Sequence, residues 1–346
     1  MTDKEALSNL IKAQALALGF DLAGITTLGP AETADAFDDW LARGYAGEMT
    51  YLPRGAEKRR DTRLPYPGAT SAIVVALNYG GTSPSGPIAR YARGDDYHDV
   101  TWEKLDSLHH WIEDHLGRTV RGKAYVDTGP ILERDLARQA GLGWFGKNTN
   151  LINPEIGSFF FIGSLLVDLE LAPDAPFEAD RCGTCTRCLD ACPTQALVAP
   201  QVLDATRCIS YLTIEARGEI PVQLRESLGE LVYGCDICQD VCPWNVSFAR
   251  DLSEPALAPR PEMESPSLVD LMRLTLERWR EFSRGSAIKR AKRSGFLRNV
   301  AVALGNSGAP EAVPALEDAL SDEEPLVREH AAWALQTIST SRVSSS

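Results

Sequence analysis

The eight cysteines of the chain are the residues whose spacing points most directly to chemistry. Four of them lie in the stretch CGTCTRCLDACP, with the pattern C-x2-C-x2-C-x3-C-P. This is the run of a bacterial ferredoxin, in which three thiolates bind one [4Fe–4S] cluster and the fourth reaches a second cluster. These four residues are Cys182, Cys185, Cys188 and Cys192.

A second, incomplete copy of this run follows as CDICQDVCP, with Val232 where its first cysteine is expected. Two clusters need eight thiolates, and the one cysteine outside both runs is Cys208. The sequence therefore predicts two [4Fe–4S] clusters. We assign Cys182, Cys185, Cys188 and Cys242 to the first cluster, and Cys192, Cys208, Cys235 and Cys238 to the second.

Two structural zinc sites with four cysteines each are the alternative. Zinc motifs need neither the third cysteine of the triplet nor the prolines that follow both runs, so we favour the clusters. This assignment uses every cysteine and leaves none as a nucleophile.

Composition narrows the class of protein. A chain of 346 residues predicts two or three domains, and a net charge of −13 disfavours general affinity for nucleic acid. No stretch approaches the roughly 20 apolar residues of a membrane span, and MTDKEALSNL lacks a signal-peptide pattern. We expect a cytoplasmic protein, in which eight cysteines favour metal or redox chemistry over disulfides. Nothing suggests an obligate interface, so we expect a monomer.

The hydrophobic pattern before the cysteines alternates between helix and strand periods. It predicts helices at 3–18, 100–116 and 131–141, and strands at 71–79, 123–130 and 157–171. We expect an α+β multidomain protein whose first domain, residues 1–176, is α/β.

The remainder of the chain divides into a cysteine module and a helical part. We expect a ferredoxin-like domain with two clusters at 177–252, a HEAT-like helical domain at 262–338 and a disordered tail at 339–346. The pattern around Leu297 recurs around Val327 after thirty residues, whereas HEAT repeats usually span about 40–47.

Two features could bind a ligand in the first domain. The stretch GLGWFGKN resembles a phosphate-binding loop, but Asn148 replaces the hydroxyl that binds magnesium, which excludes nucleotide hydrolysis. Its glycines still allow the backbone to approach another ligand closely. Asp127 ends a predicted strand, where it either caps a turn or faces a ligand crevice.

Residues 284–298 include six basic residues and no acidic residue. The run is either a solvated helix face or a contact for nucleic-acid phosphates, and its concentration in an acidic chain favours the phosphates. The basic residues are Arg284, Lys289, Arg290, Lys292, Arg293 and Arg298.

Taken together and in order, five segments resemble the epoxyqueuosine reductase family across nearly the whole chain. They are YVDTGPILER, AGLGWFGKNTNLINPEIGSFFFIG, CGTCTRCLDACPTQAL, RCISYLTIE and YGCDICQDVCPWN.

The resemblance implies reduction of epoxyqueuosine to queuosine at the wobble position of tRNA, the last step of queuosine biosynthesis. It implies a nitroreductase-like corrinoid-binding domain that carries cobalamin beside the two clusters. The chain has no D-x-H-x-x-G cobalamin run, so cobalamin comes from the resemblance alone. The implied partners are tRNA, which the basic residues of 284–298 would bind, and an unidentified reductant.

The resemblance also implies roles for single residues. Asp127 would donate a proton, which requires its pKa to lie well above about 3.9. The residues expected at the cobalamin are Tyr97, His98, Asp127, Gly146, Lys147, Asn148, Thr149, Leu151, Ser210 and Arg217.

Two other functions are compatible with the cysteines. A corrinoid iron–sulfur reductase of a small molecule would share the cofactors, but it would not explain the basic helical part. An electron-transfer ferredoxin would not need the α/β domain before the cysteines.

Overall fold

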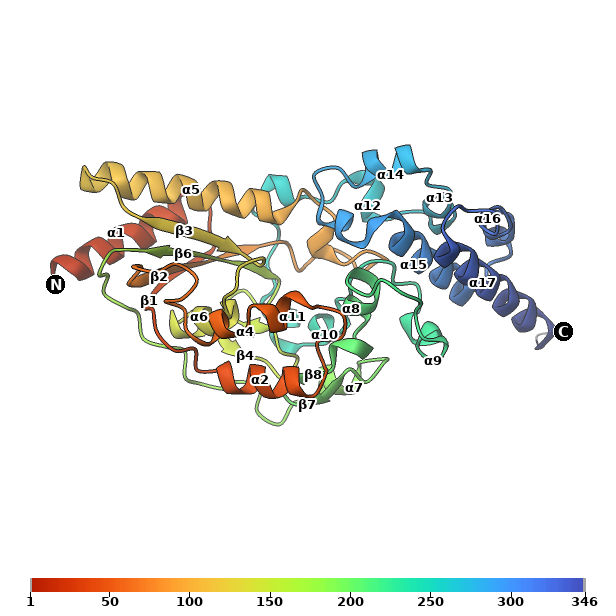
Figure 1. Ribbon diagram of the computed structural model, residues 1–346, viewed down its shortest axis with the longest axis horizontal. Helices are drawn as coiled ribbons and strands as arrows, with labels where there is room; N and C mark the ends of the chain where they lie inside the picture. The colour runs from red at the N-terminus through yellow and green to blue at the C-terminus, as the bar shows by residue number, and fades with distance from the viewer. Residues whose placement is uncertain (1, 345–346) are drawn as a thin grey trace.

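The computed structural model describes residues 2–344, and the side chains of residues 2–340. The molecule is elongated, with a sheet near the N-terminus, the cysteine-rich segment in the middle and a group of helices at the C-terminus (Figure 1). Among the described residues, no helix is both long enough and apolar enough to cross a membrane.

The N-terminal sheet has four strands in the order β1-β2-β6-β3, and all neighbours are antiparallel. The strands are β1 (Leu22–Thr27), β2 (Ser71–Asn78), β3 (Gly122–Val126) and β6 (Phe160–Val167). The predicted α/β class is wrong for this domain, which is α+β. Alternating helix and strand segments do not fix strand direction, because long connections can return the chain either way.

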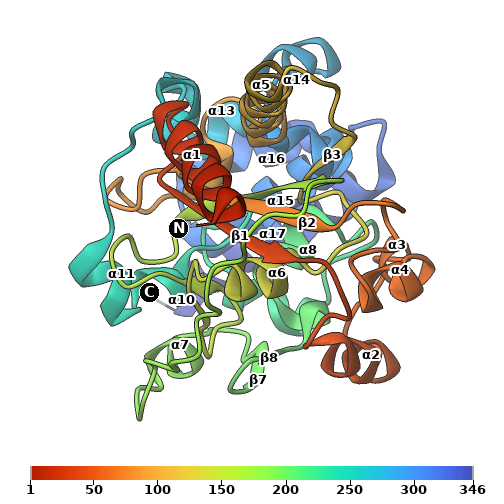
Figure 2. The ribbon, with the colours of Figure 1, turned by 90° about the vertical axis from the view of Figure 1, so that its left-hand side faces the viewer.

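Helices cover both faces of the sheet (Figure 2). α1 (Asp3–Ala17) and α5 (Tyr97–Leu116) pack on one face, and α6 (Glu133–Gln139) packs on the other. The side chain of Asp96 caps the first turn of α5, and Gly117 ends the helix in the left-handed conformation. α5 begins and β3 ends at the same side of the sheet, which places Tyr97 beside Asp127.

Short elements fill the connections of this domain. They are α2 (Ala34–Ala42), α3 (Tyr51–Arg54), α4 (Ala56–Arg60), the 3-10 helix η1 (Arg90–Ala92), β4 (Trp144–Phe145) and β5 (Leu151–Ile152). β4 and β5 pair as a hairpin, and the turn between them contains residues 146–150.

The cysteine-rich segment is built from very short elements. They are α7 (Arg187–Asp190), β7 (Leu197–Ala199), β8 (Val202–Leu203), η2 (Ala205–Arg207), α8 (Ile209–Ile214), α9 (Val222–Arg225), η3 (Glu226–Leu228), α10 (Ile237–Asp240) and α11 (Pro243–Phe248). Four of the eight cysteines lie within these helices or directly before them. Cys188 lies in α7 and Cys238 in α10, while Cys208 and Cys242 directly precede α8 and α11.

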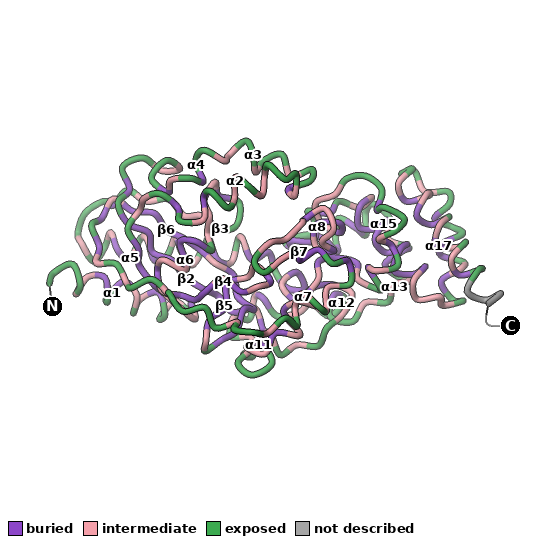
Figure 3. Tube along the Cα trace, turned by 90° about the horizontal axis from the view of Figure 1, so that it is seen from below, coloured by how far each residue is buried: buried purple, intermediate pink, exposed green. Residues whose placement is uncertain are grey.

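Helices form the C-terminal part of the chain. They are η4 (Pro255–Leu257), α12 (Pro261–Glu264), α13 (Leu268–Met272), α14 (Leu276–Phe282), η5 (Ala287–Ala291), α15 (Lys292–Ser307), η6 (Pro310–Ala312), α16 (Val313–Ala319) and α17 (Pro325–Ser344). α15 is buried over most of its length and packs against α17 (Figure 3). α17 runs through most of the tail predicted to be disordered, and residues 345–346 lie outside the described range.

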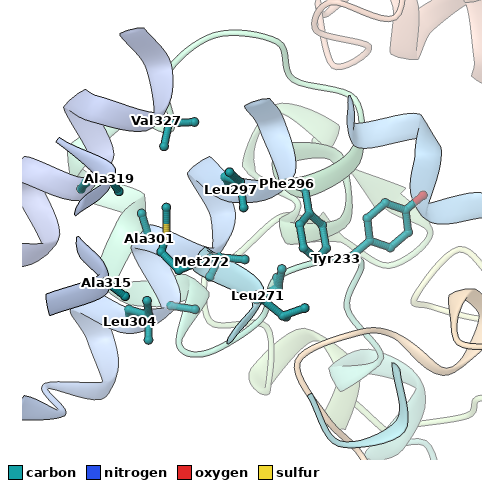
Figure 4. Close-up of a cluster of buried hydrophobic side chains, with 14 of the residues drawn as sticks. Tyr233, Leu271, Met272, Phe296, Leu297, Ala301, Leu304, Ala315, Ala319 and Val327 are labelled. Atoms are coloured by element: carbon teal, nitrogen blue, oxygen red, sulfur yellow. The ribbon is translucent and has the colours of Figure 1, made fainter. Parts of the chain in front are cut away.

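The core of these helices extends beyond them. Figure 4 shows Phe296 and Leu271 packed around Tyr233, which belongs to the cysteine-rich segment. Ile88, from the N-terminal domain, is buried in the same cluster. The three parts of the chain therefore share a hydrophobic core, and this holds the cysteine-rich segment between the other two.

Candidate active site

The eight cysteines line two neighbouring cavities. The first cavity, of about 350 Å³, is lined by Cys182, Cys185, Cys188 and Cys242. The second cavity, of about 380 Å³, is lined by Cys192, Cys208, Cys235 and Cys238. These are the two sets of four that the spacing predicted. Within residues 2–344, no three His, Cys, Asp or Glu side chains converge as a single-ion site would require.

Cys208 and Cys235 in the second cavity do not have the lowered pKa of a nucleophilic thiol. Burial raises the pKa of Cys235 to about 12, and it also raises the pKa of Cys208. Such thiols are protonated at neutral pH, and coordination to a metal centre is the usual way to deprotonate them.

Besides the cysteines, residues at the end of the sheet line the second cavity. Asp127 directly follows β3, and Tyr97 is the first residue of α5. The Tyr97 hydroxyl donates a hydrogen bond of 2.8 Å to Asp127 Oδ2. The ring of Tyr97 stacks on Phe161 of β6 at a centroid distance of 4.0 Å. Asp127 thus faces the cavity from a rigid wall, with 63% of its side chain exposed.

The turn at residues 127–130 is held from two sides. Asp127 has a φ of 56°, in the left-handed region that residues other than glycine rarely adopt. Its backbone N–H donates to Glu133 Oε1 at 2.5 Å, and the carbonyl of Gly129 accepts from Arg59 Nη2 at 3.3 Å. A Cβ atom on Gly129 would lie 2.4 Å from the ring of Tyr125, so the turn fits closely against β3.

His98 links Asp127 to a second carboxylate. Its Nδ1 lies 2.6 Å from Asp96 Oδ1, and its Nε2 lies 3.5 Å from Asp127 Oδ2. Burial by itself lowers the pKa of His98, but the two carboxylates raise it to about 9, so the ring is protonated at neutral pH. Burial acts to raise the pKa of Asp96, yet hydrogen bonds from His98 and Lys289 hold it well below the usual range.

The two carboxyl groups at the cavity have pKa values shifted in opposite directions. Burial acts to raise the pKa of Asp127, but the His98 cation and the Tyr97 hydroxyl outweigh it, and the pKa falls below its usual value. The pKa well above about 3.9 that proton donation by Asp127 was said to require is therefore not found, because both partners stabilise the carboxylate. Burial, and then the charge of Asp127, raise the pKa of Glu133 to about 8. Glu133 is therefore the carboxyl that is protonated at neutral pH.

The structure brings part of the predicted cobalamin-contacting set to the second cavity. The residues of this set that line it are Tyr97, Asp127, Asn148, Thr149, Leu151 and Ser210. Thr149 turns its backbone through a φ of 69°, which bends the 146–150 turn around the cavity edge. Asn148 borders both cavities, and its Nδ2 donates to the carbonyl of Cys238 at 3.2 Å.

Four residues of that set lie outside the lining of the second cavity. His98 lies behind Asp127, and Gly146 packs so closely that an added Cβ would meet Ile152 at 2.5 Å. The Lys147 ammonium donates to the carbonyls of Gly183 and Cys185 at the first cavity. The Arg217 guanidinium donates to the carbonyl of Arg290.

Most of the predicted phosphate-binding residues are engaged within the protein. Lys289 lies 2.7 Å from Asp96, and Arg290 pairs with Glu215 at 2.8 Å. Arg293 is half-buried and pairs with Asp322 at 2.6 Å. Among the described residues, Arg284 and Lys292 are exposed and have no ion-pair partner.

Arg298 does not lie at the surface. Its side chain is 0% exposed, and the guanidinium donates to the carbonyls of Leu212, Ala216 and Gly218. The prediction that Arg298 contacts nucleic acid is therefore wrong. Its charge is satisfied by carbonyl groups at the C-terminal end of α8 and just beyond it.

Sequence reasoning assigned no role to several residues of the second cavity. Glu133 and Arg134 stand in the quoted segment YVDTGPILER, six and seven positions after Asp127. The closeness of the Glu133 carboxyl to Asp127 in the sequence could have indicated a role for Glu133 beside Asp127. The aromatic wall of Tyr79, Tyr91 and Phe160 carried no such signal, because buried aromatic residues are common in any core.

Three family models match successive parts of the chain. Residues 59–128 match a model described as epoxyqueuosine reductase QueG, residues 181–245 match a 4Fe-4S double cluster binding domain, and residues 286–346 match HEAT repeats. The predicted iron–sulfur segment and the HEAT-like character of the C-terminal helices are thereby confirmed.

Whole-chain comparisons point to one family. A protein of Shigella dysenteriae serotype 1, named epoxyqueuosine reductase, is 40% identical over 343 residues, covering 96% of this chain and 90% of that protein. A solved structure described as epoxyqueuosine reductase with a tRNA-Tyr epoxyqueuosine-modified stem loop superposes with a TM-score of 0.88 at 34% identity. The match covers 96% of this chain and 90% of that one.

A further solved structure, of the Bacillus subtilis enzyme, has a TM-score of 0.85 at 32% identity, with the same coverage of both chains. It is described as having its catalytic aspartate loop swung out of the active site. From the family model, the sequence identity and the shared fold, this chain belongs to the epoxyqueuosine reductase family.

Proposed function

We propose that this protein reduces epoxyqueuosine to queuosine at the wobble position of tRNA, the last step of queuosine biosynthesis. One observation carries the proposal beyond family membership. The second set of four cysteines, which would hold a cluster, and the Asp127 carboxylate line the same cavity, so an electron donor and a group that can relay a proton would face one space. A related structure is described with an epoxyqueuosine-modified tRNA stem loop, and we propose the anticodon region as the partner here.

The reaction fixes what the cavity has to supply. The epoxide loses its oxygen as water, both carbon–oxygen bonds break and a carbon–carbon double bond forms. This consumes two electrons and two protons. We propose that an unidentified one-electron reductant gives the electrons to a cluster at the first cavity. A second cluster, at Cys192, Cys208, Cys235 and Cys238, would pass them to the reaction cavity.

We propose that the second cavity also holds cobalamin, as the family resemblance implies. Asn148, Thr149 and Ser210 offer hydrogen bonds to amide groups at the edge of a corrin, and Leu151 and Phe161 offer apolar contact. The cavity of about 380 Å³ is partly open to solvent, so a group larger than the cavity could extend beyond it. When bound, cobalamin supplies a low-valent cobalt that delivers electrons to the epoxide.

We propose that Asp127 delivers a proton to the leaving oxygen. The carboxylate is charged at rest, and the protonated His98 has its Nε2 3.5 Å from Asp127 Oδ2. Asp96 holds the other ring nitrogen and so orients the imidazole. Binding of the substrate would remove water from the carboxylate, which favours transfer of the His98 proton to Asp127 and then to the substrate.

We also propose that the antiparallel sheet domain is a nitroreductase-like corrinoid-binding fold, and that the protein acts as a monomer in the cytoplasm. The turn at 127–130 is proposed to correspond to the catalytic aspartate loop described for the Bacillus subtilis structure.

The proposed function is tested in a bacterial strain that lacks its own epoxyqueuosine reductase. Expression of this protein should convert the accumulated epoxyqueuosine of the tRNA pool to queuosine, as measured by nucleoside mass spectrometry. Persistence of epoxyqueuosine, while the protein is folded and loaded with iron, would exclude the function.

A further inference from the structure

We propose that Glu133 is a positioning residue that holds the Asp127 turn in its reactive conformation by accepting a hydrogen bond from the Asp127 backbone N–H. The inference rests on the proposed role of Asp127. It assigns Glu133 a task distinct from delivery of the proton.

Glu133 lies on a helix that is fixed by its packing on the sheet, so it can hold the Asp127 turn in place. It is the first residue of α6, which packs against β1, β2 and β6 on one face of the sheet. Its Oε1 lies 2.5 Å from the Asp127 nitrogen. The hydrogen bond thus connects the turn to an element whose place is fixed by the hydrophobic core.

Such a restraint acts on the backbone of Asp127. A φ of 56° is uncommon at a residue other than glycine, although aspartate and asparagine adopt it more readily than the other side chains, and a hydrogen bond to the backbone favours it further. The contacts with Tyr97 and His98 involve the carboxylate and so orient the side chain. Glu133 is the group that holds the backbone of this residue.

At its other end the turn is held more loosely. Arg59 donates to the carbonyl of Gly129 at 3.3 Å, and its Nη1 has no partner among the described residues. The contact between Glu133 and the Asp127 N–H is the shorter of these two, and it acts on the residue whose carboxylate faces the cavity.

The chemistry of the contact predicts which substitution preserves it. Burial and the charge of Asp127 raise the pKa of Glu133 to about 8, so the side chain is mostly neutral when it accepts this hydrogen bond. The side chain of glutamine has the same length as that of glutamate, and its carbonyl oxygen can accept the same hydrogen bond. Glu133→Gln should keep the turn in place, whereas Glu133→Ala should release it.

A matched control exists at the opposite end of the domain. Glu113 Oε1 accepts a hydrogen bond from the Val120 N–H at 2.9 Å, so Glu113→Ala removes a contact of the same kind away from the cavity. It should leave the Asp127 turn unchanged.

The first test is hydrogen–deuterium exchange of the reconstituted protein without tRNA, followed in peptides that contain Asp127. In Glu133→Ala, the Asp127 amide should exchange its hydrogen at least about tenfold faster than in the wild-type protein. In Glu133→Gln and Glu113→Ala, this amide should exchange at the wild-type rate. Wild-type exchange in Glu133→Ala, or equally fast exchange in Glu133→Gln, would overturn the proposal.

The second test is turnover of an epoxyqueuosine stem loop. Glu133→Ala should lower kcat about 10- to 100-fold at unchanged stem-loop affinity, and Glu133→Gln should restore it. If Glu133→Gln keeps the Asp127 amide protected but has the low kcat of Glu133→Ala, Glu133 donates a proton. This result would overturn its positioning role. If wild-type protein shows the protected amide but no turnover, the proposed function fails and the restraint on the turn stands.

Discussion

Asp127 is the residue on which the proposed chemistry depends most. Asp127→Asn should lower kcat by at least about 100-fold, because an amide cannot deliver a proton as an acid. Asparagine tolerates the left-handed backbone found here, so the fold, the clusters and tRNA binding should persist. The measurement is single-turnover formation of queuosine. Asp99→Asn, exposed on the same helix as Tyr97, is the control, and near-wild-type activity of Asp127→Asn would remove Asp127 from the mechanism.

The pKa values around Asp127 predict the pH dependence. Both Glu133, at about 8, and His98, at about 9, are protonated below these values and lose their protons above them. If the His98 proton replenishes Asp127, kcat should fall as the pH rises through about 9. His98→Gln should lower kcat and abolish this alkaline decline. A kcat that stays constant up to pH 10 with saturating reductant would contradict the role of His98.

The same shift has a consequence for stability. The folded-state pKa of His98 is raised above the usual histidine value of 6.5, so its protonation stabilises the fold fully below pH 6.5. That contribution is lost as the pH rises through about 9.

Sequence spacing predicted the two sets of four cysteines that line the two cavities, because this spacing is set by local chain geometry, and elimination supplied Cys208. The direction of the Asp127 pKa could not be predicted in this way. It depends on Tyr97 and His98, which tertiary packing brings from about thirty residues away. The role of Glu133 depends on a hydrogen bond to a left-handed backbone, which no residue pattern encodes.

At the scale of elements, the basic run contains residues with different roles. It begins after α14, passes through η5 and enters α15, so successive side chains point in different directions. Arg298 falls on the buried face of α15, although the run looks continuous in sequence. Helix periodicity alone would not have identified this, because an arginine on that face is buried only when carbonyl groups are available to receive it.

Arg284 and Lys292 are the better candidates for contact with tRNA phosphates, because their charges are not paired within the described structure. Replacing both by alanine should lower tRNA affinity and reduce the log–log salt slope by up to about 0.7–0.9 per lost contact. The measurement is stem-loop and full-length tRNA binding at several salt concentrations.

The control for this pair is Arg118→Ala with Lys123→Ala, which removes the same charge from the far end of the sheet domain. Equal salt slopes in the two double variants would show that the tRNA is held by another surface.

At the scale of the whole molecule, the sequence predicted three successive parts, and the family models match one region in each. It did not predict that the parts share a core. Ile88 and Tyr233 pack with the C-terminal helices, so contacts distant in sequence fix the cysteine segment against both neighbours. The antiparallel sheet was missed for a similar reason, since strand direction follows from the path of the long connections.

The two cavities predict how iron is divided between them. Reconstituted wild-type protein should bind about eight iron atoms, and Cys208→Ser or Cys185→Ser should each retain about four. The remaining cluster should differ between the variants, because Cys208 lines the second cavity and Cys185 lines the first. Iron analysis with electron paramagnetic resonance tests this. Retention of about eight iron atoms by Cys208→Ser would refute its place as a ligand.

The most direct test of the account is the mass of an epoxyqueuosine-modified anticodon stem loop after reaction with the purified protein, reconstituted with iron, sulfide and cobalamin and supplied with a low-potential reductant. We predict the loss of one oxygen atom from the modified base, dependent on both the reductant and cobalamin, with the RNA otherwise intact. An unchanged mass, with the stem loop bound and both clusters reduced, would contradict it.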